Sequence, residues 1–187
     1  MCAMKFVRFL EPNSLERLNL CAKIKAAGCR HCKCPSAVVV HGHLWGYAAS
    51  GDERTTRGLR LLCSNRYSNP GCGRSFPVYW DTVIPHCSLR TFKLLELVRT
   101  VAAGQSTHGA RLVAARDISI STAYRWVARW RNLATHIRTR LCLLVPPPGK
   151  SDGQPDLFTL HHLAAAFPKA VCAIAAFQNG LQTAITG

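Results

Sequence analysis

Residues 63–76 read CSNRYSNPGCGRSF, with two cysteines nine positions apart and the turn-forming sequences SNP and PG between them. Upstream, residues 29–32 read CRHC, the usual two-residue spacing for half of a tetrahedral zinc site. The insert can loop out and return Cys72 to Cys63, and Gly73 lets the backbone close around the sulfur. The sequence therefore predicts a structural Zn²⁺ site formed by Cys29, Cys32, Cys63 and Cys72.

The spacing leaves alternatives to this ligand set. Cys34 could replace Cys32, and one thiolate could be replaced by an imidazole from His31, His41 or His43. A redox pair is disfavoured, because CRHC does not lie at the strand-to-helix junction of a βαβ unit. The simplest alternative is a set of buried cysteines that bind no metal. Such a role is expected for the cysteines in apolar or terminal settings, namely Cys2, Cys21, Cys142 and Cys172.

The charge of the chain favours a polyanionic partner, most often nucleic acid. Its 187 residues include 24 Lys and Arg against 9 Asp and Glu, a net charge of +15. Residues 88–140 hold ten basic side chains, nine of them Arg, against two acidic ones. Over half of the net charge thus lies in one block. Arg is also the side chain best shaped to contact phosphates and guanine edges.

The first residues show no secretory signal, and no run approaches the ~18 to 20 apolar residues that span a bilayer. We therefore expect a cytoplasmic, nucleoid-associated protein. In that compartment ten cysteines favour metal binding or burial over a disulfide framework.

The pattern of short strands and longer helices predicts an α+β fold. Three β-rich runs, at 37–47, 57–63 and 74–80, are expected to form a small zinc-ribbon-like three-stranded sheet. Such a small sheet buries little apolar surface and needs a staple. A short strand at 5–10 and a helix over roughly 14–27 precede it. The expected segments are 1–28, the ribbon at 29–87, a helical domain at 88–141, a Pro/Gly linker at 142–157 and an Ala-rich helical tail at 158–187.

Residues 105–131, QSTHGARLVAARDISISTAYRWVARWR, fit a helix-turn-helix within a three-helix domain. Leu112 and Val113 are expected to form the packing face of the first of these two helices. Asp117 takes the turn position that favours a left-handed backbone, and Ser119 caps the recognition helix. The predicted DNA contacts, two of them in the ribbon, are Ser119, Ile120, Ser121, Thr122, Tyr124, Arg125, Arg129, Arg131, Arg66 and Arg74.

Taken together, CRHC, VVVHGHLWGY, RGLRLLCSN, GCGRSF and ISISTAYRWVARW resemble the transposase-type zinc ribbon plus helix-turn-helix of insertion-sequence proteins. The resemblance covers about residues 29–131. It implies zinc at the same four cysteines and a recognition helix beginning at residues 119–125. Arg30 stands where proline is usual, Asp117 stands where glycine is usual, and the second cysteine pair is more widely spaced.

These patterns favour a DNA-binding accessory or regulatory protein of a mobile element, and not an enzyme. The nine acidic residues are scattered, and the ~45 residues after the helix-turn-helix leave no room for a catalytic domain with metal-binding carboxylates. Duplex DNA is the expected partner. A transposase and a second copy bound through the tail are further candidates. The alternatives are an RNA-binding zinc ribbon and a metal-dependent nuclease using His41 and His43.

Overall fold

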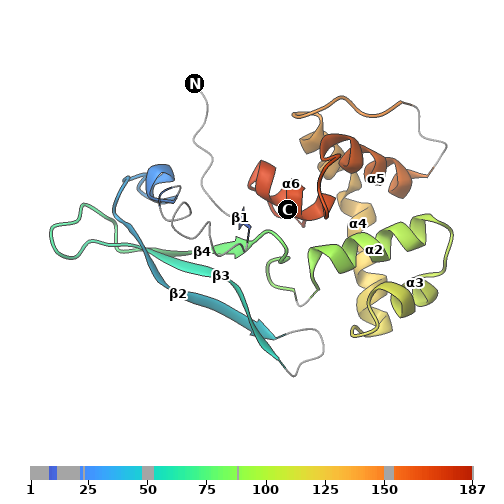
Figure 1. Cartoon of the computed structure of the whole chain (residues 1–187), viewed down its shortest axis with the longest axis horizontal. Coiled ribbons are helices and arrows are strands. Elements are labelled where there is room, and N and C mark those ends of the chain that lie inside the picture. Colours follow the sequence, from blue (N-terminus) through green and yellow to red (C-terminus); the bar gives the residue numbers. More distant parts are fainter. Residues whose placement is uncertain are drawn as a thin grey trace.

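The computed structural model describes residues 9–11, 22, 24–47, 53–87, 89–149 and 154–186. It has the α+β architecture expected from the sequence, with the sheet at one end of an elongated molecule and the helices at the other (Figure 1). The strands are β1 (Phe9–Leu10), β2 (Val38–Tyr47), β3 (Arg54–Cys63) and β4 (Ser75–Trp80). The helices are α2 (Thr91–Ala102), α3 (Thr107–Ala114), α4 (Ile120–Leu141), α5 (Pro155–Ala166) and α6 (Ala173–Leu181). No helix in the described ranges is both long and apolar enough to cross a membrane.

The three β-rich runs form the antiparallel part of a four-stranded sheet with the order β1-β4-β3-β2. The additional strand, β1, pairs in parallel with β4 and places Phe9 opposite Tyr79. Only these two residues of the predicted strand at 5–10 lie within the described part of the chain. The predicted helix over 14–27 also lies largely outside it, although residues 24–27 are helical. Gly28 follows with φ +71°, as expected of a residue that ends a helix.

The sheet has a small core of its own. Leu61 and Val78, from the two central strands, are fully buried, and Ile24 packs against the same cluster. Two cysteines, Cys29 and Cys63, belong to this core and are themselves fully buried. The sheet region therefore relies on its cysteines for part of its interior, as its limited apolar area requires.

The helices share one larger core. Residues of α2 and α4, such as Leu97 and Ile137, pack in the same cluster as Leu163 of α5 and Phe177 of α6. The Ala-rich tail thus buries its apolar side chains within its own chain, and pairing of two copies through it stays a prediction. α5 begins at Pro155, inside the segment predicted to be a linker.

The predicted packing face of α3 is wrong. Leu112 and Val113 are 40% and 65% exposed, whereas Ala110 is fully buried. Only a small side chain fits there, because α3 has eight residues and contacts both α2 and α4. Phe92, at the start of α2, is exposed as well. α2 is covered by four helices, so its buried face is wider than a single stripe.

The turn between α3 and α4, residues 115–119, does not use a left-handed residue. Asp117 lacks a positive φ and instead forms an ion pair with Lys93 of α2, with 2.6 Å between Nζ and Oδ2. Arg111 donates to the carbonyl groups of Arg116 and Ile118, at 3.2 and 2.7 Å. Arginine bonds to these carbonyl groups therefore hold the turn. The predicted cap is confirmed, because the Ser119 hydroxyl accepts the Thr122 N–H.

Two arginines bond the sheet to the segment that leads into α2. Arg57 of β3 is buried, and its guanidinium donates to the carbonyl oxygens of Ile84 (3.0 Å) and Cys87. Arg90 donates to the Thr55 hydroxyl of the same strand at 2.9 Å. Burial, with the charge of Arg90 nearby, lowers the pKa of Arg57. Arg57 is thus a structural residue that joins the sheet to the helices.

Two glutamines of α6 bond the helices to the sheet from the other side. The buried Gln178 amide donates to the carbonyl oxygens of Asp81 (2.7 Å) and Val83 (3.0 Å). One turn later, Gln182 accepts from the N–H of Phe9 at 2.9 Å and donates to its carbonyl at 3.1 Å. This side chain therefore gives β1 the pair of hydrogen bonds that a neighbouring strand would provide.

We expect Arg57→Met to destabilise the protein by about 2–4 kcal/mol, because it leaves two carbonyl groups at the junction without their donor. The measurement is the free energy of unfolding in denaturant. Arg60→Met is the matched control, since Arg60 is exposed on the same strand. Equal unfolding free energies for the two variants would contradict this role for Arg57.

Candidate metal centre and nucleic-acid interface

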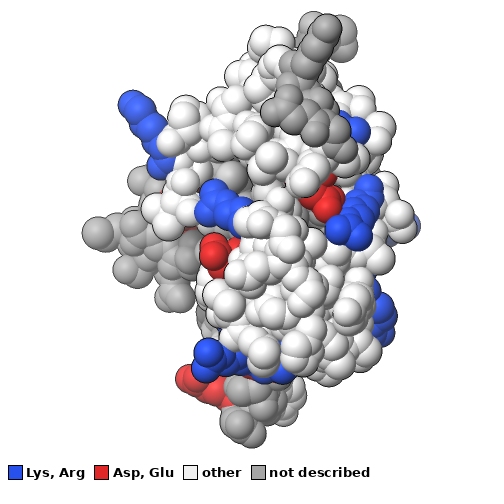
Figure 2. Space-filling view, turned by 90° about the vertical axis from the view of Figure 1, so that its right-hand side faces the viewer, with Lys and Arg blue, Asp and Glu red and all other residues white. Residues whose placement is uncertain are grey.

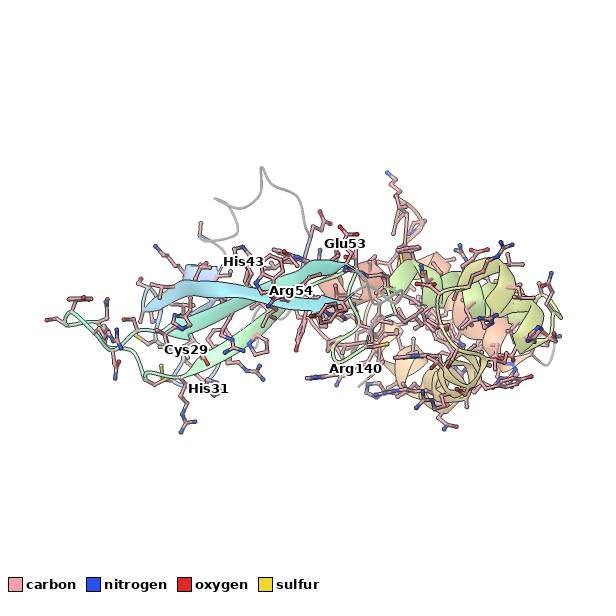
Figure 3. All side chains as sticks on the ribbon, turned by 90° about the horizontal axis from the view of Figure 1, so that it is seen from below. Cys29, His31, His43, Glu53, Arg54 and Arg140 are labelled. Carbon is pink, nitrogen blue, oxygen red and sulfur yellow. The ribbon has the colours of Figure 1, made fainter. Side chains whose placement is uncertain are left out.

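Four cysteines from separate segments meet at the part of the sheet remote from the helices. Cys29 and Cys32 lie in the loop before β2, Cys63 ends β3, and Cys72 lies in the loop before β4. Figure 3 shows Cys29 there, well away from the helices. These four residues form the only group in the described part of the chain that could hold a metal ion, and we call it the cysteine cluster.

The sulfur positions fit a tetrahedral metal ion and exclude a disulfide. All four Sγ atoms lie within 4.8 Å of one another. Cys29 and Cys72 are 3.8 Å apart, and Cys32 and Cys63 are 3.6 Å apart. A disulfide requires about 2.05 Å. A regular tetrahedron with metal–sulfur bonds of about 2.3 Å has sulfur atoms about 3.8 Å apart. The cysteine cluster can therefore hold a metal ion without rearrangement.

Both cysteine pairs close with the same backbone hydrogen bond, from the residue after the second cysteine to the carbonyl of the first (Lys33 to Cys29, 2.7 Å; Gly73 to Cys63, 2.9 Å). The His31 N–H donates to the Cys29 sulfur, and the Cys72 N–H donates to the Cys63 sulfur, each at 3.3 Å. The residue after the second cysteine of each pair has a left-handed backbone, with φ +62° at Lys33 and +73° at Gly73. These N–H groups stabilise negative charge on the sulfur atoms. The wide second pair is thus equivalent to the compact first pair.

A short set of backbone hydrogen bonds closes the insert between Cys63 and Cys72. The Gly71 N–H donates to the Ser64 carbonyl at 3.1 Å, and the Gly73 N–H donates to the Cys63 carbonyl at 2.9 Å. A Cβ at Gly71 would lie 2.1 Å from the Ser64 oxygen. The prediction that the insert loops out is therefore confirmed. Gly71 was not singled out from the sequence, although the PG turn signal included it.

Hydrogen bonding and burial shift the pKa values of two of these thiols in opposite directions. The pKa of Cys32 is lowered to about 7, mainly because its sulfur accepts a hydrogen bond from the Cys34 backbone N–H. Burial is the main cause that raises the pKa of Cys63 to about 12. Without a cation, Cys63 therefore keeps its proton at neutral pH. Because a metal ligand must be a thiolate, a cation bound here would displace that proton.

The alternative ligands lie elsewhere. The Cys34 thiol donates to the Pro35 carbonyl at 3.4 Å, and the His31 ring packs edge-on against Phe76 at 6.0 Å. His41 and His43 lie on β2, where the His43 ring is 5.9 Å from Trp45. Figure 3 shows His43 on the opposite side of the sheet from His31. The described residues give the histidine pair no metal-binding partners of the kind that a nuclease needs.

The predicted DNA contacts on α4 fall on two faces of the helix. Ser119, Ile120, Ser121 and Tyr124 are exposed and face outward. A second set, which follows the spacing i, i+3 and i+7, lines a cavity against the sheet; it contains Thr122, Arg125 and Arg129. The recognition helix predicted from the sequence therefore presents two different surfaces.

Arg131 occupies a third position, because its Nε donates to Asp156 of α5 at 2.9 Å. Arg66 is exposed on the insert, and Arg74 is exposed two residues after Cys72. Figure 2 views the helical end of the molecule, where Lys and Arg side chains are scattered without forming a continuous basic patch. The basic surface expected from the composition is therefore not on that end.

We expect Gly71→Ala to weaken metal binding by at least 10-fold, because a methyl group 2.1 Å from the Ser64 oxygen prevents closure of the second cysteine pair. The measurement is competition with a chromophoric chelator. Gly42→Ala, in β2, is the control, because a Cβ there meets nothing within 4 Å. Unchanged metal affinity in Gly71→Ala would show that the insert closes in another way.

Comparisons with family models, with curated proteins and with solved structures found no match.

Proposed function

We propose that this protein binds duplex DNA through the start of α4 and that Zn²⁺ in the cysteine cluster holds the sheet region together. The main support for DNA binding is the structure at the start of α4. It is capped by Ser119, follows a short turn after α3, and exposes Ile120, Ser121 and Tyr124. A helix-turn-helix inserts this part of its second helix into the major groove.

The donor set supports zinc as the metal. Four thiolates in tetrahedral geometry are typical of structural Zn²⁺ sites, and the same set also binds iron. When bound, Zn²⁺ would supply a fixed crosslink between the two cysteine pairs and no redox chemistry. The sheet's small core is consistent with a need for such a crosslink. Zinc is therefore proposed as a structural ion, with no part in a reaction.

The charge of the helical block supports nucleic acid as the partner. Residues 88–140 carry a net +8, and Arg116, in the turn before α4, is exposed beside the outward face. Basic side chains next to a helix that reads bases would contact the phosphate backbone and add a salt-dependent term to the affinity. The likeness to transposase-type zinc-ribbon and helix-turn-helix proteins points the same way. On this proposal the chain is an accessory or regulatory protein of a mobile element.

RNA binding is a second candidate, favoured by exposed aromatic side chains of the sheet region. Trp45 and Tyr47 are exposed on β2, and Tyr67 in the insert is 95% exposed. The Arg54 guanidinium lies over the Trp45 ring, 5.1 Å from its centroid. Exposed aromatic rings with stacked arginine can bind unpaired bases. Competition between duplex DNA and single-stranded RNA at one salt concentration separates the two functions.

Metal analysis of purified protein should find about one zinc per chain and little iron. Cys29→Ser should lose the metal, because three thiolates leave the tetrahedron incomplete. Cys34→Ser is the control and should keep it, because Cys34 lies outside the cysteine cluster. Metal-free wild-type protein, or metal loss in both variants, would overturn the proposed site.

Tyr124→Ala should reduce the ratio of specific to non-specific DNA affinity by about 10-fold to 100-fold, as expected for loss of a base contact. The specific sequence is first selected from a random duplex pool. His136→Ala, exposed on the same helix more than three turns later, should leave the ratio unchanged. If both variants keep the wild-type ratio, the start of α4 does not read bases.

A further inference from the structure

A cleft with a volume of about 680 Å³ separates the sheet from the start of α4. Its walls include Arg30, Tyr79 and His86 on the sheet side and Thr122, Arg125 and Arg129 on the helix side. The volume lies within the ~300 to 1,000 Å³ typical of ligand pockets. The cleft exists because Arg57 and the glutamines of α6 bond the sheet to the helices without filling the space between them.

Duplex DNA cannot enter this cleft. A duplex, whose major groove alone is about 12 Å wide, is too large for a cleft of about 680 Å³. Thr122, Arg125 and Arg129 face the sheet across the cleft, whereas Ile120, Ser121 and Tyr124 face outward. The cleft-facing side chains are therefore free to contact a ligand other than the duplex.

Among the described residues, three arginines line the cleft (Arg30, Arg125 and Arg129) and no acidic side chain does. Ion pairs in the described ranges join Lys93 to Asp117 and Arg131 to Asp156, so the three cleft arginines have no carboxylate partner there. Arg125 donates to the Thr122 hydroxyl at 3.1 Å, and Arg129 donates to the Thr186 carbonyl at 3.3 Å. Each guanidinium has five N–H donors, so most remain available to phosphate oxygens.

Aromatic rings line the cleft between these charges. Tyr79 and His86 meet edge to face, with 6.3 Å between ring centroids. On the opposite wall, Trp126 lies under the Arg129 guanidinium at 5.5 Å. His86 has φ +59°, a conformation that non-glycine residues rarely adopt. The fold thus holds an aromatic side chain in an unfavourable backbone conformation at the wall of the cleft.

We propose that this cleft binds a single-stranded segment of nucleic acid. Its phosphates contact Arg30, Arg125 and Arg129, and its bases stack on Tyr79, His86 and Trp126. A basic groove that also contains stacking rings is the arrangement that binds single strands with little sequence preference. This inference rests on the proposed function in one respect: the single strand would lie beside a duplex bound by the outward face of α4.

The test is fluorescence anisotropy of labelled 12-nucleotide single strands, with a blunt duplex measured separately at the same salt concentration. Arg30→Gln and His86→Asn are the test variants, because both residues lie on the sheet wall, away from the duplex-reading face. Asn also tolerates the left-handed backbone at position 86. We expect His86→Asn to weaken single-strand binding by about 10-fold, as expected for loss of one stacked base. Arg30→Gln should weaken it and reduce its salt dependence, as expected for loss of one phosphate contact, and both variants should keep duplex affinity.

Arg140→Gln is the matched control, because it removes one exposed positive charge from the C-terminal end of α4. It should change single-strand affinity by less than about 2-fold, in line with its distance from the cleft and ionic screening. An abasic DNA strand of equal length should bind more weakly than the intact strand. RNA and DNA strands of the same sequence show which sugar the cleft accepts.

Each result bears on a different claim. Wild-type single-strand affinity in both cleft variants, or an equal loss in Arg140→Gln, would overturn the cleft as the site. Equal binding of abasic and intact strands would overturn the stacking of bases. If the wild-type protein binds single strands but does not bind the duplex, the proposed function is overturned and the cleft remains as the single-strand site.

Discussion

The return of Cys72 to Cys63 is the contact on which the sheet region depends. Eight residues separate the two cysteines, and the backbone hydrogen bonds of Gly71 and Gly73 reduce this insert to the geometry of a compact pair. Cys29 and Cys63 also fill part of the sheet's small core. The proposed metal ion would therefore add a crosslink between the two cysteine pairs to the apolar volume that these side chains already bury. A sheet of this size has little other means of staying folded.

The position of the sheet depends on a different set of contacts. Arg57 of β3 bonds to the segment before α2, and Gln178 of α6 bonds to the segment after β4. Gln182 then supplies β1 with a substitute strand partner. The C-terminal helix thus takes part in placing the sheet, and the cleft is the space that this placement leaves. A connection between the tail and the start of α4 follows, because Thr186 accepts a hydrogen bond from Arg129.

Local patterns in the sequence predicted the local structure well. Cysteine spacing and turn residues predicted the cysteine cluster, and β-rich runs predicted β2, β3 and β4 to within about three residues. The errors came from contacts between distant residues. Asp117 lacks the left-handed backbone because Lys93 and Arg111 support the turn instead. No pattern near Gln178 or Gln182 could show that a polar side chain would bond to a sheet more than 90 residues away.

Net charge gives the expectation of a nucleic-acid partner, which stays a prediction, and does not by itself locate a binding surface. Of the arginines in the helical block, Arg90, Arg111 and Arg131 bond to other parts of the same chain. Because the guanidinium groups of these three arginines already donate to acceptors in the chain, they contribute less to phosphate binding. Arg125 and Arg129 differ, because they have no carboxylate partner among the described residues and line the cleft. The strongest positive field near α4 is therefore expected where the sheet and the start of α4 face each other, and not on the helical end of the molecule.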